Sequence, residues 1–84
     1  MNKNDKIVER FMTLPKEFTF DEMEKLLTYF GYEKSNKGKT LGSRVIFKKD
    51  GSAPILLHKP HPSNIMKEYA LKQVYNVLRN NELI

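Results

Sequence analysis

A turn sequence at Asp50-Gly51-Ser52, with a short apolar run on each side, is the feature that most restricts the fold of this chain. Such a turn between two short apolar runs is typical of a β-hairpin. We therefore expect Ser43 to Lys49 and Ala53 to Lys59 to pair as antiparallel strands. Because side chains alternate across a strand, one face of this hairpin is expected to be apolar and to need a covering layer.

A three-residue loop at positions 50 to 52 fixes the register of this hairpin and the composition of its two faces. The apolar face consists of two opposed pairs, Phe47 with Ile55 and Val45 with Leu57. The other face consists of Ile46 with Leu56, Arg44 with His58, and Lys48. This second face mixes apolar and basic side chains, so we expect it to meet solvent, substrate or a partner.

Three further segments have the residue spacing of amphipathic helices. The first, Asn4 to Leu14, is ended by Pro15, whose ring cannot continue a helix. The second begins with an S/T-x-x-E capping box formed by Thr19 and Glu22, and it ends at Gly31. The third lies near the C-terminus, and its expected buried face is Met66, Tyr69, Ala70, Gln73, Val74, Val77 and Leu78. We interpret Tyr69 and Tyr75 as core or core-edge aromatics rather than as base-stacking platforms.

With a short strand expected at Tyr32 to Ser35, the element order is α-α-β-β-β-α. This order predicts an α+β fold, in which helices pack on one face of a three-stranded antiparallel sheet. A chain of 84 residues supplies one compact core, so we expect a single domain over residues 1-84, with residues 1-17 as an N-terminal helical extension. The chain has no cysteine and no apolar N-terminal stretch, which favours the cytoplasm and argues against a membrane location.

The net charge of +5 is concentrated in the middle of the chain. The basic residues there are Lys34, Lys37, Lys39, Arg44, Lys48, Lys49, Lys59, Lys67 and Lys72, interrupted by the acids Asp50 and Glu68. A folded surface of this kind favours phosphate backbones or an acidic protein partner. A solvated, lysine-rich surface accounts for the charge equally well.

Several short motifs follow one another in a characteristic order. They are Leu26-Leu27, Phe30-Gly31-Tyr32, Gly42-Ser43 followed by Phe47, the run His58 to Pro62, and Leu71 ten residues after His61. In order and spacing the chain resembles the HicA toxins of bacterial toxin-antitoxin pairs over residues 18-84. The resemblance implies a double-stranded-RNA-binding-domain-like core, α-β-β-β-α, that cleaves mRNA and is neutralised by a HicB-type antitoxin.

One motif departs from the family pattern. The family has Gly-Ser-His with a catalytic histidine, whereas this chain has Gly42-Ser43-Arg44. Arginine binds phosphate through its planar fork but cannot act as a general base near neutral pH. The resemblance assigns His61 a structural or RNA-contacting role.

The expected register offers a replacement for the missing histidine, because it places His58 opposite Arg44. We hypothesise that His58 takes the proton of a 2′-hydroxyl while Arg44 holds the scissile phosphate. Histidine suits this role because its ordinary pKa is about 6.5. As an alternative, a histidine beside prolines at a strand end serves as a capping or turn residue. Further RNA contacts are expected from Lys37, Lys39, Ser43, Arg44, Lys48, Lys59 and His61.

Two function classes remain open at this point. The first is a toxin that binds mRNA and cleaves it without a metal or another cofactor. The second is a catalytically inactive RNA- or protein-binding module on the same fold, which the arginine at position 44 favours. Metal binding is not expected, because two histidines without cysteine or a nearby carboxylate leave a zinc ion under-coordinated.

Overall fold

The computed structural model of the chain describes residues 3–35, 44–60 and 63–84. These residues form α1 (Lys3–Met12), α2 (Phe20–Tyr29), β1 (Glu33–Ser35), β2 (Arg44–Lys48), β3 (Ile55–His58) and α3 (Glu68–Asn80). The strands form an antiparallel sheet in the order β1-β2-β3. The α+β fold of the double-stranded-RNA-binding type, with an extra N-terminal helix, is therefore confirmed.

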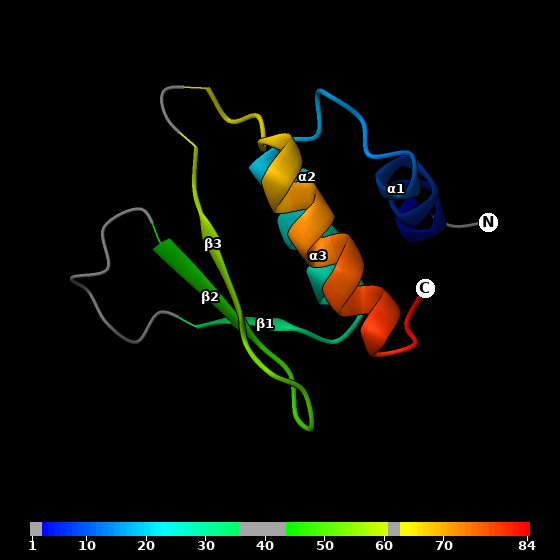
Figure 1. Cartoon of the computed structure of the whole chain (residues 1–84), viewed down its shortest axis with the longest axis vertical. Helices are drawn as coiled ribbons and strands as arrows, with labels where there is room; N and C mark the ends of the chain where they lie inside the picture. Colours follow the sequence, from blue (N-terminus) through cyan, green and yellow to red (C-terminus); the bar gives the residue numbers. More distant parts are fainter. Residues whose placement is uncertain (1–2, 36–43, 61–62) are drawn as a thin grey trace.

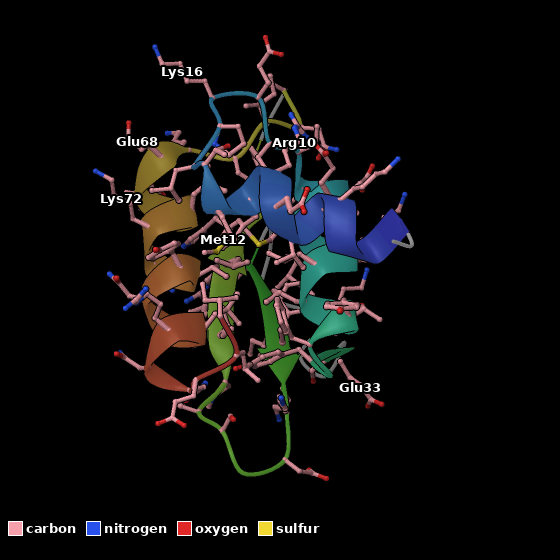
Figure 2. All side chains as sticks on the ribbon, turned by 90° about the vertical axis from the view of Figure 1, so that its right-hand side faces the viewer. Arg10, Met12, Lys16, Glu33, Glu68 and Lys72 are labelled. Atoms are coloured by element: carbon pink, nitrogen blue, oxygen red, sulfur yellow. The ribbon has the colours of Figure 1, made fainter. Side chains whose placement is uncertain are left out.

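The helices and the sheet form layers (Figure 1). Figure 2 shows α2 and α3 side by side in front of the sheet, with α1 crossing them on the side away from the sheet. One sheet face is thus covered by helices, and none of the described helices covers the other, which we call the open face. No helix in the described part of the chain has the length and apolar character needed to cross a membrane.

The hairpin of β2 and β3 has the register expected from the sequence. Its opposed pairs are Arg44 with His58, Val45 with Leu57, Ile46 with Leu56, and Phe47 with Ile55. In the turn, the Ser52 N–H donates to the Lys49 carbonyl at 3.1 Å, and Gly51 has φ +81°, as a type II turn requires at its third residue. The strands are shorter than expected at this end, because Pro54 has no N–H to continue the ladder.

The end of α2 explains why β1 also begins later than expected. Gly31, at φ +93°, donates its N–H to the Thr28 carbonyl at 3.0 Å, and Tyr32 donates to the Leu27 carbonyl at 2.9 Å. These two bonds form a Schellman motif, which uses the backbone of Tyr32 to close the helix. The strand therefore starts at Glu33.

All three helices and the covered sheet face contribute to one hydrophobic core. Its buried residues are Phe11, Phe18, Phe20, Met23, Leu26, Leu27, Tyr32, Phe47, Ile55, Leu57, Met66, Ala70, Leu71, Val74 and Leu78. Phe11 connects α1 to this core, with its ring centroid 5.6 Å from that of Phe18 and 6.3 Å from that of Tyr75. The half-buried Tyr75 is thus the core-edge aromatic that the sequence indicated.

The prediction of which α3 side chains are buried was wrong on one side of the apolar stripe. Tyr69 is 62% exposed and Gln73 is exposed, whereas Leu71 is buried. Ala70 and Val74 occupy the centre of the apolar stripe in either orientation, so the spacing alone does not decide which flank turns inward. The structure buries the wholly apolar Leu71 and leaves the polar ends of Tyr69 and Gln73 at the surface, which avoids burying polar groups.

A capping box closes the N-terminus of α2, as the sequence predicted. The Glu22 N–H donates to the Thr19 hydroxyl at 3.1 Å, and the Thr19 N–H donates to the Glu22 carboxylate at 3.0 Å. Arg10 of α1 also pairs with this carboxylate. Burial raises the pKa of Glu22, but the bonds from Arg10 and Thr19 outweigh it, so the pKa lies below its ordinary value.

We expect Thr19→Ala to lower the free energy of unfolding by about 1 kcal/mol, because the helix loses a side-chain cap.

Since the folded pKa of Glu22 is lowered, the stabilisation by its carboxylate is present above the ordinary glutamate pKa and is lost as pH falls through the folded value. Urea unfolding of wild type and Glu22→Gln should therefore differ at pH 7 and converge in acid. An equal difference at both pH values would contradict this.

Candidate functional site

The open face of the sheet brings Arg44 and His58 together. They are directly opposed in the β2–β3 ladder, and both are exposed. Directly opposed residues of an antiparallel pair have Cβ atoms about 4.5–5.5 Å apart and point to the same face. The expectation that the guanidinium and the imidazole share one exposed face is therefore confirmed.

Two other expected RNA-contacting residues are described and exposed. Lys48 lies at the far end of β2, opposite Glu33 of β1, and Lys59 directly follows His58. Lys37, Lys39, Ser43 and His61 lie outside the described residues. The described cations of this site are thus Arg44, Lys48 and Lys59. The acid Glu33 lies beside Lys48.

Three lysines of the basic middle segment make contacts within the protein. The Lys34 Nζ lies 3.3 Å from the Glu24 carboxylate on α2, and the Lys72 Nζ lies 3.0 Å from Glu68. Lys49 lies over the Tyr32 ring, with 5.7 Å between its Nζ and the ring centroid. The charge of the segment is therefore spread over several surfaces, and only part of it lies on the open face.

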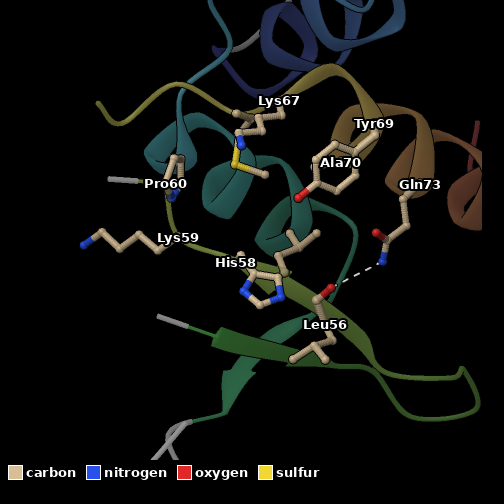
Figure 3. Close-up of a pocket in the computed structure, with 10 residues that line it drawn as sticks. Leu56, His58, Lys59, Pro60, Lys67, Tyr69, Ala70 and Gln73 are labelled. Atoms are coloured by element: carbon tan, nitrogen blue, oxygen red, sulfur yellow. Dashed lines mark hydrogen bonds between the residues drawn. The ribbon is translucent and has the colours of Figure 1, made fainter. Parts of the chain in front are cut away.

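A groove runs between the outer edge of β3 and α3 (Figure 3). Its lining includes Leu56, His58, Lys59, Lys67, Tyr69 and Gln73. The Gln73 Nε2 donates to the Leu56 carbonyl at 3.3 Å, which ties α3 to the edge strand. His58 therefore belongs both to the open face and to this groove. Sequence reasoning missed the groove because its two walls come from distant segments.

The pair of Arg44 and His58 combines two useful chemical groups. A guanidinium donates paired hydrogen bonds to phosphate oxygens, and an imidazole can accept or release a proton near neutral pH. Within the described ranges, no group of three or more His, Cys, Asp or Glu side chains is arranged to hold a metal ion. The arrangement is suited to binding a phosphodiester and to moving a proton beside it.

These features define the chain as a small α+β domain with a basic open sheet face. Comparison with protein families finds a match over residues 20–81 to the family described as "HicA toxin of bacterial toxin-antitoxin". This range is more than half of the chain, so the chain belongs to the HicA toxin family and is the toxin of a pair that includes an antitoxin. Comparisons with curated proteins and with solved structures give no significant match.

The matched range begins at Phe20, the first residue of α2, and ends one residue beyond α3. It therefore includes the sheet, the groove and both members of the Arg44–His58 pair. It leaves out α1, the helix that crosses α2 and α3.

Proposed function

We propose that this chain is an mRNA endonuclease, neutralised by a HicB-type antitoxin, and that Arg44 and His58 perform the cleavage. The observation that carries this proposal is the direct opposition of the two residues on the exposed sheet face. Family membership supports an RNA-cleaving activity. The position of His58 supplies a proton acceptor where the family's catalytic histidine is replaced by Arg44.

In the proposed reaction, His58 removes the proton from a ribose 2′-hydroxyl. The 2′ oxygen then attacks the adjacent phosphorus and breaks its bond to the 5′ oxygen of the next nucleotide, which takes a proton from solvent. Arg44 stabilises the negative charge that develops on the phosphorus oxygens. The products are a 2′,3′-cyclic phosphate and a 5′-hydroxyl, and no other reactant is required.

A second candidate function is an RNA- or protein-binding module that has lost its catalyst. The observation in its favour is Arg44, which stands where the family resemblance implies a histidine. Such a module would keep phosphate binding through the guanidinium but would lack the base at that position. Measurement of cleavage separates the two candidates.

RNA binding is expected to weaken steeply with salt, because Arg44, Lys48 and Lys59 would act through phosphate contacts. Three to five contacts with a single strand predict a loss of roughly 20- to 130-fold in affinity between 50 and 200 mM salt. Fluorescence anisotropy with a labelled RNA measures this loss. An affinity independent of salt would contradict the basic face as an RNA site and favour a protein partner.

A matched pair of lysine variants sharpens this measurement. Lys59→Gln removes a cation beside His58 and should lower the slope of log affinity against log salt by about 0.7. Lys72→Gln removes the same charge from an exposed position on α3, where the lysine already pairs with Glu68. We expect Lys72→Gln to leave the slope nearly unchanged, so that the two variants separate local contact from net charge.

A further inference from the structure

We propose that the groove between β3 and α3 holds the base of an unpaired RNA nucleotide, next to the phosphate bound at Arg44 and His58. This inference rests on the proposed function and extends it, because it assigns the position of a neighbouring nucleotide. His58 lines the groove, and it is also a member of the Arg44–His58 pair. A chain whose phosphate lies at His58 therefore has a base within reach of the groove.

Tyr69 supplies the aromatic surface that a base requires. It stands near the start of α3, it is 62% exposed, and its ring borders the groove together with the imidazole of His58 (Figure 3). The other described aromatics of α3 and the sheet, Phe47 and Tyr75, are buried or half-buried. Stacking on an exposed tyrosine ring is more favourable for a base than exposure to water, and every base can stack in this way.

The remaining walls suit the shape and polarity of a base. Met66, Leu57 and Ala70 also line the groove, and they are 3%, 2% and 7% exposed, so they offer a firm apolar floor. Gln73 is held by the bond from its Nε2 to the Leu56 carbonyl. An amide also has an acceptor oxygen and a second N–H, which can pair with the polar edge of a base.

The charge around the groove favours a nucleotide. Lys59 and Lys67 line it, and none of the described lining residues is acidic. The nearest acid in sequence, Glu68, pairs with Lys72 at 3.0 Å. The combination of an aromatic ring, an anchored amide and two lysines matches a base attached to a phosphate chain, whereas an acidic peptide would use only the lysines.

Binding of an uncleavable, 2′-O-methylated single-stranded oligonucleotide tests this inference without any dependence on catalysis. Tyr69→Ala should weaken binding roughly 5- to 150-fold, since stacking on one aromatic side chain accounts for an effect of that size. Tyr69→Phe keeps the ring and should stay within about 2-fold of wild type. Tyr29→Ala removes an exposed tyrosine of α2 outside the groove and should not change binding. Circular dichroism checks that each variant is folded.

Abasic substitution identifies the stacked nucleotide. Removing one base at a time should weaken binding to wild type at one position, and removal at that position should have no effect on binding to Tyr69→Ala. Wild-type affinity in Tyr69→Ala would overturn the inference, as would a loss confined to antitoxin binding.

The same measurements separate this inference from the proposed function. If RNA binding depends on Tyr69 but the protein never cleaves RNA, the proposal that the groove holds a base is supported and the proposed endonuclease activity is overturned. If cleavage depends on His58 but not on Tyr69, the proposal that the groove holds a base is overturned and the proposed endonuclease activity is supported.

Discussion

Replacing His58 with alanine is expected to lower the rate of RNA cleavage roughly 10²- to 10⁴-fold, which is the usual contribution of a general base. The imidazole is the proposed acceptor of the 2′-hydroxyl proton, and alanine has no group to replace it. In cells, expression of the wild-type chain without its antitoxin should arrest growth, and His58→Ala should relieve the arrest. Cleavage of a labelled RNA by the purified proteins measures the effect directly.

Stability serves as the control for this variant. His58 is exposed, so its replacement should change the free energy of unfolding by no more than about 0.5 kcal/mol. Activity and stability should therefore separate. If His58→Ala cleaves RNA as fast as wild type, the base lies elsewhere, and His61 is the other histidine of the chain to test.

Substitutions at position 44 distinguish an active enzyme from an inactive module. Arg44→Ala should lower cleavage if the guanidinium stabilises phosphate charge, and Arg44→Lys should recover only part of it, because lysine lacks the planar fork. Arg44→His restores the histidine that the family resemblance implies. Cleavage by Arg44→His together with an inactive wild type would identify the natural chain as a binding module.

Phe11→Ala is expected to lower the free energy of unfolding by about 3–5 kcal/mol, the usual cost of removing a buried phenylalanine. The Phe11 side chain is fully buried and packs against Phe18 and Tyr75. We therefore propose that α1 folds with the rest of the chain as part of one domain, although the family match begins only at Phe20.

Met12→Ala is the matched control, because Met12 lies on the same helix but is 39% exposed. It should cost much less than Phe11→Ala in urea unfolding. Equal, small effects of the two variants would show that α1 is a separable extension. A total stability of roughly 4–13 kcal/mol is usual for a chain of this length, so the expected loss is a large share of it.

Local patterns made much of the fold predictable. The pairing of Arg44 with His58 followed from alternation and loop length, because a shift of β3 by one residue would turn Ile55 and Leu57 to the exposed face. The capping box of Thr19 and Glu22 depends only on neighbouring residues, and it was found in the same way. Where a sequence pattern has one low-energy solution, it specifies the structure.

Features that depend on packing between distant segments were not predictable in this way. The spacing of α3 allowed either Tyr69 or Leu71 to face inward, and only the shape of the core decides between them. The groove required the edge of β3 to meet the flank of α3, which no local motif encodes. Likewise, the ion pair of Lys34 with Glu24 joins β1 to α2 and could not be read from the charge of the middle segment.

The chemistry of the cleaved RNA ends tests the central claim most directly. Purified wild-type protein should convert a defined RNA into products that carry a 2′,3′-cyclic phosphate and a 5′-hydroxyl, since the 2′ oxygen is the proposed nucleophile. Mass spectrometry identifies these ends, and an oligonucleotide with a single 2′-deoxy sugar at the cleaved position should remain intact. Products ending in a 3′-hydroxyl and a 5′-phosphate, or an RNA that wild type leaves uncut, would contradict the assignment of His58 and Arg44.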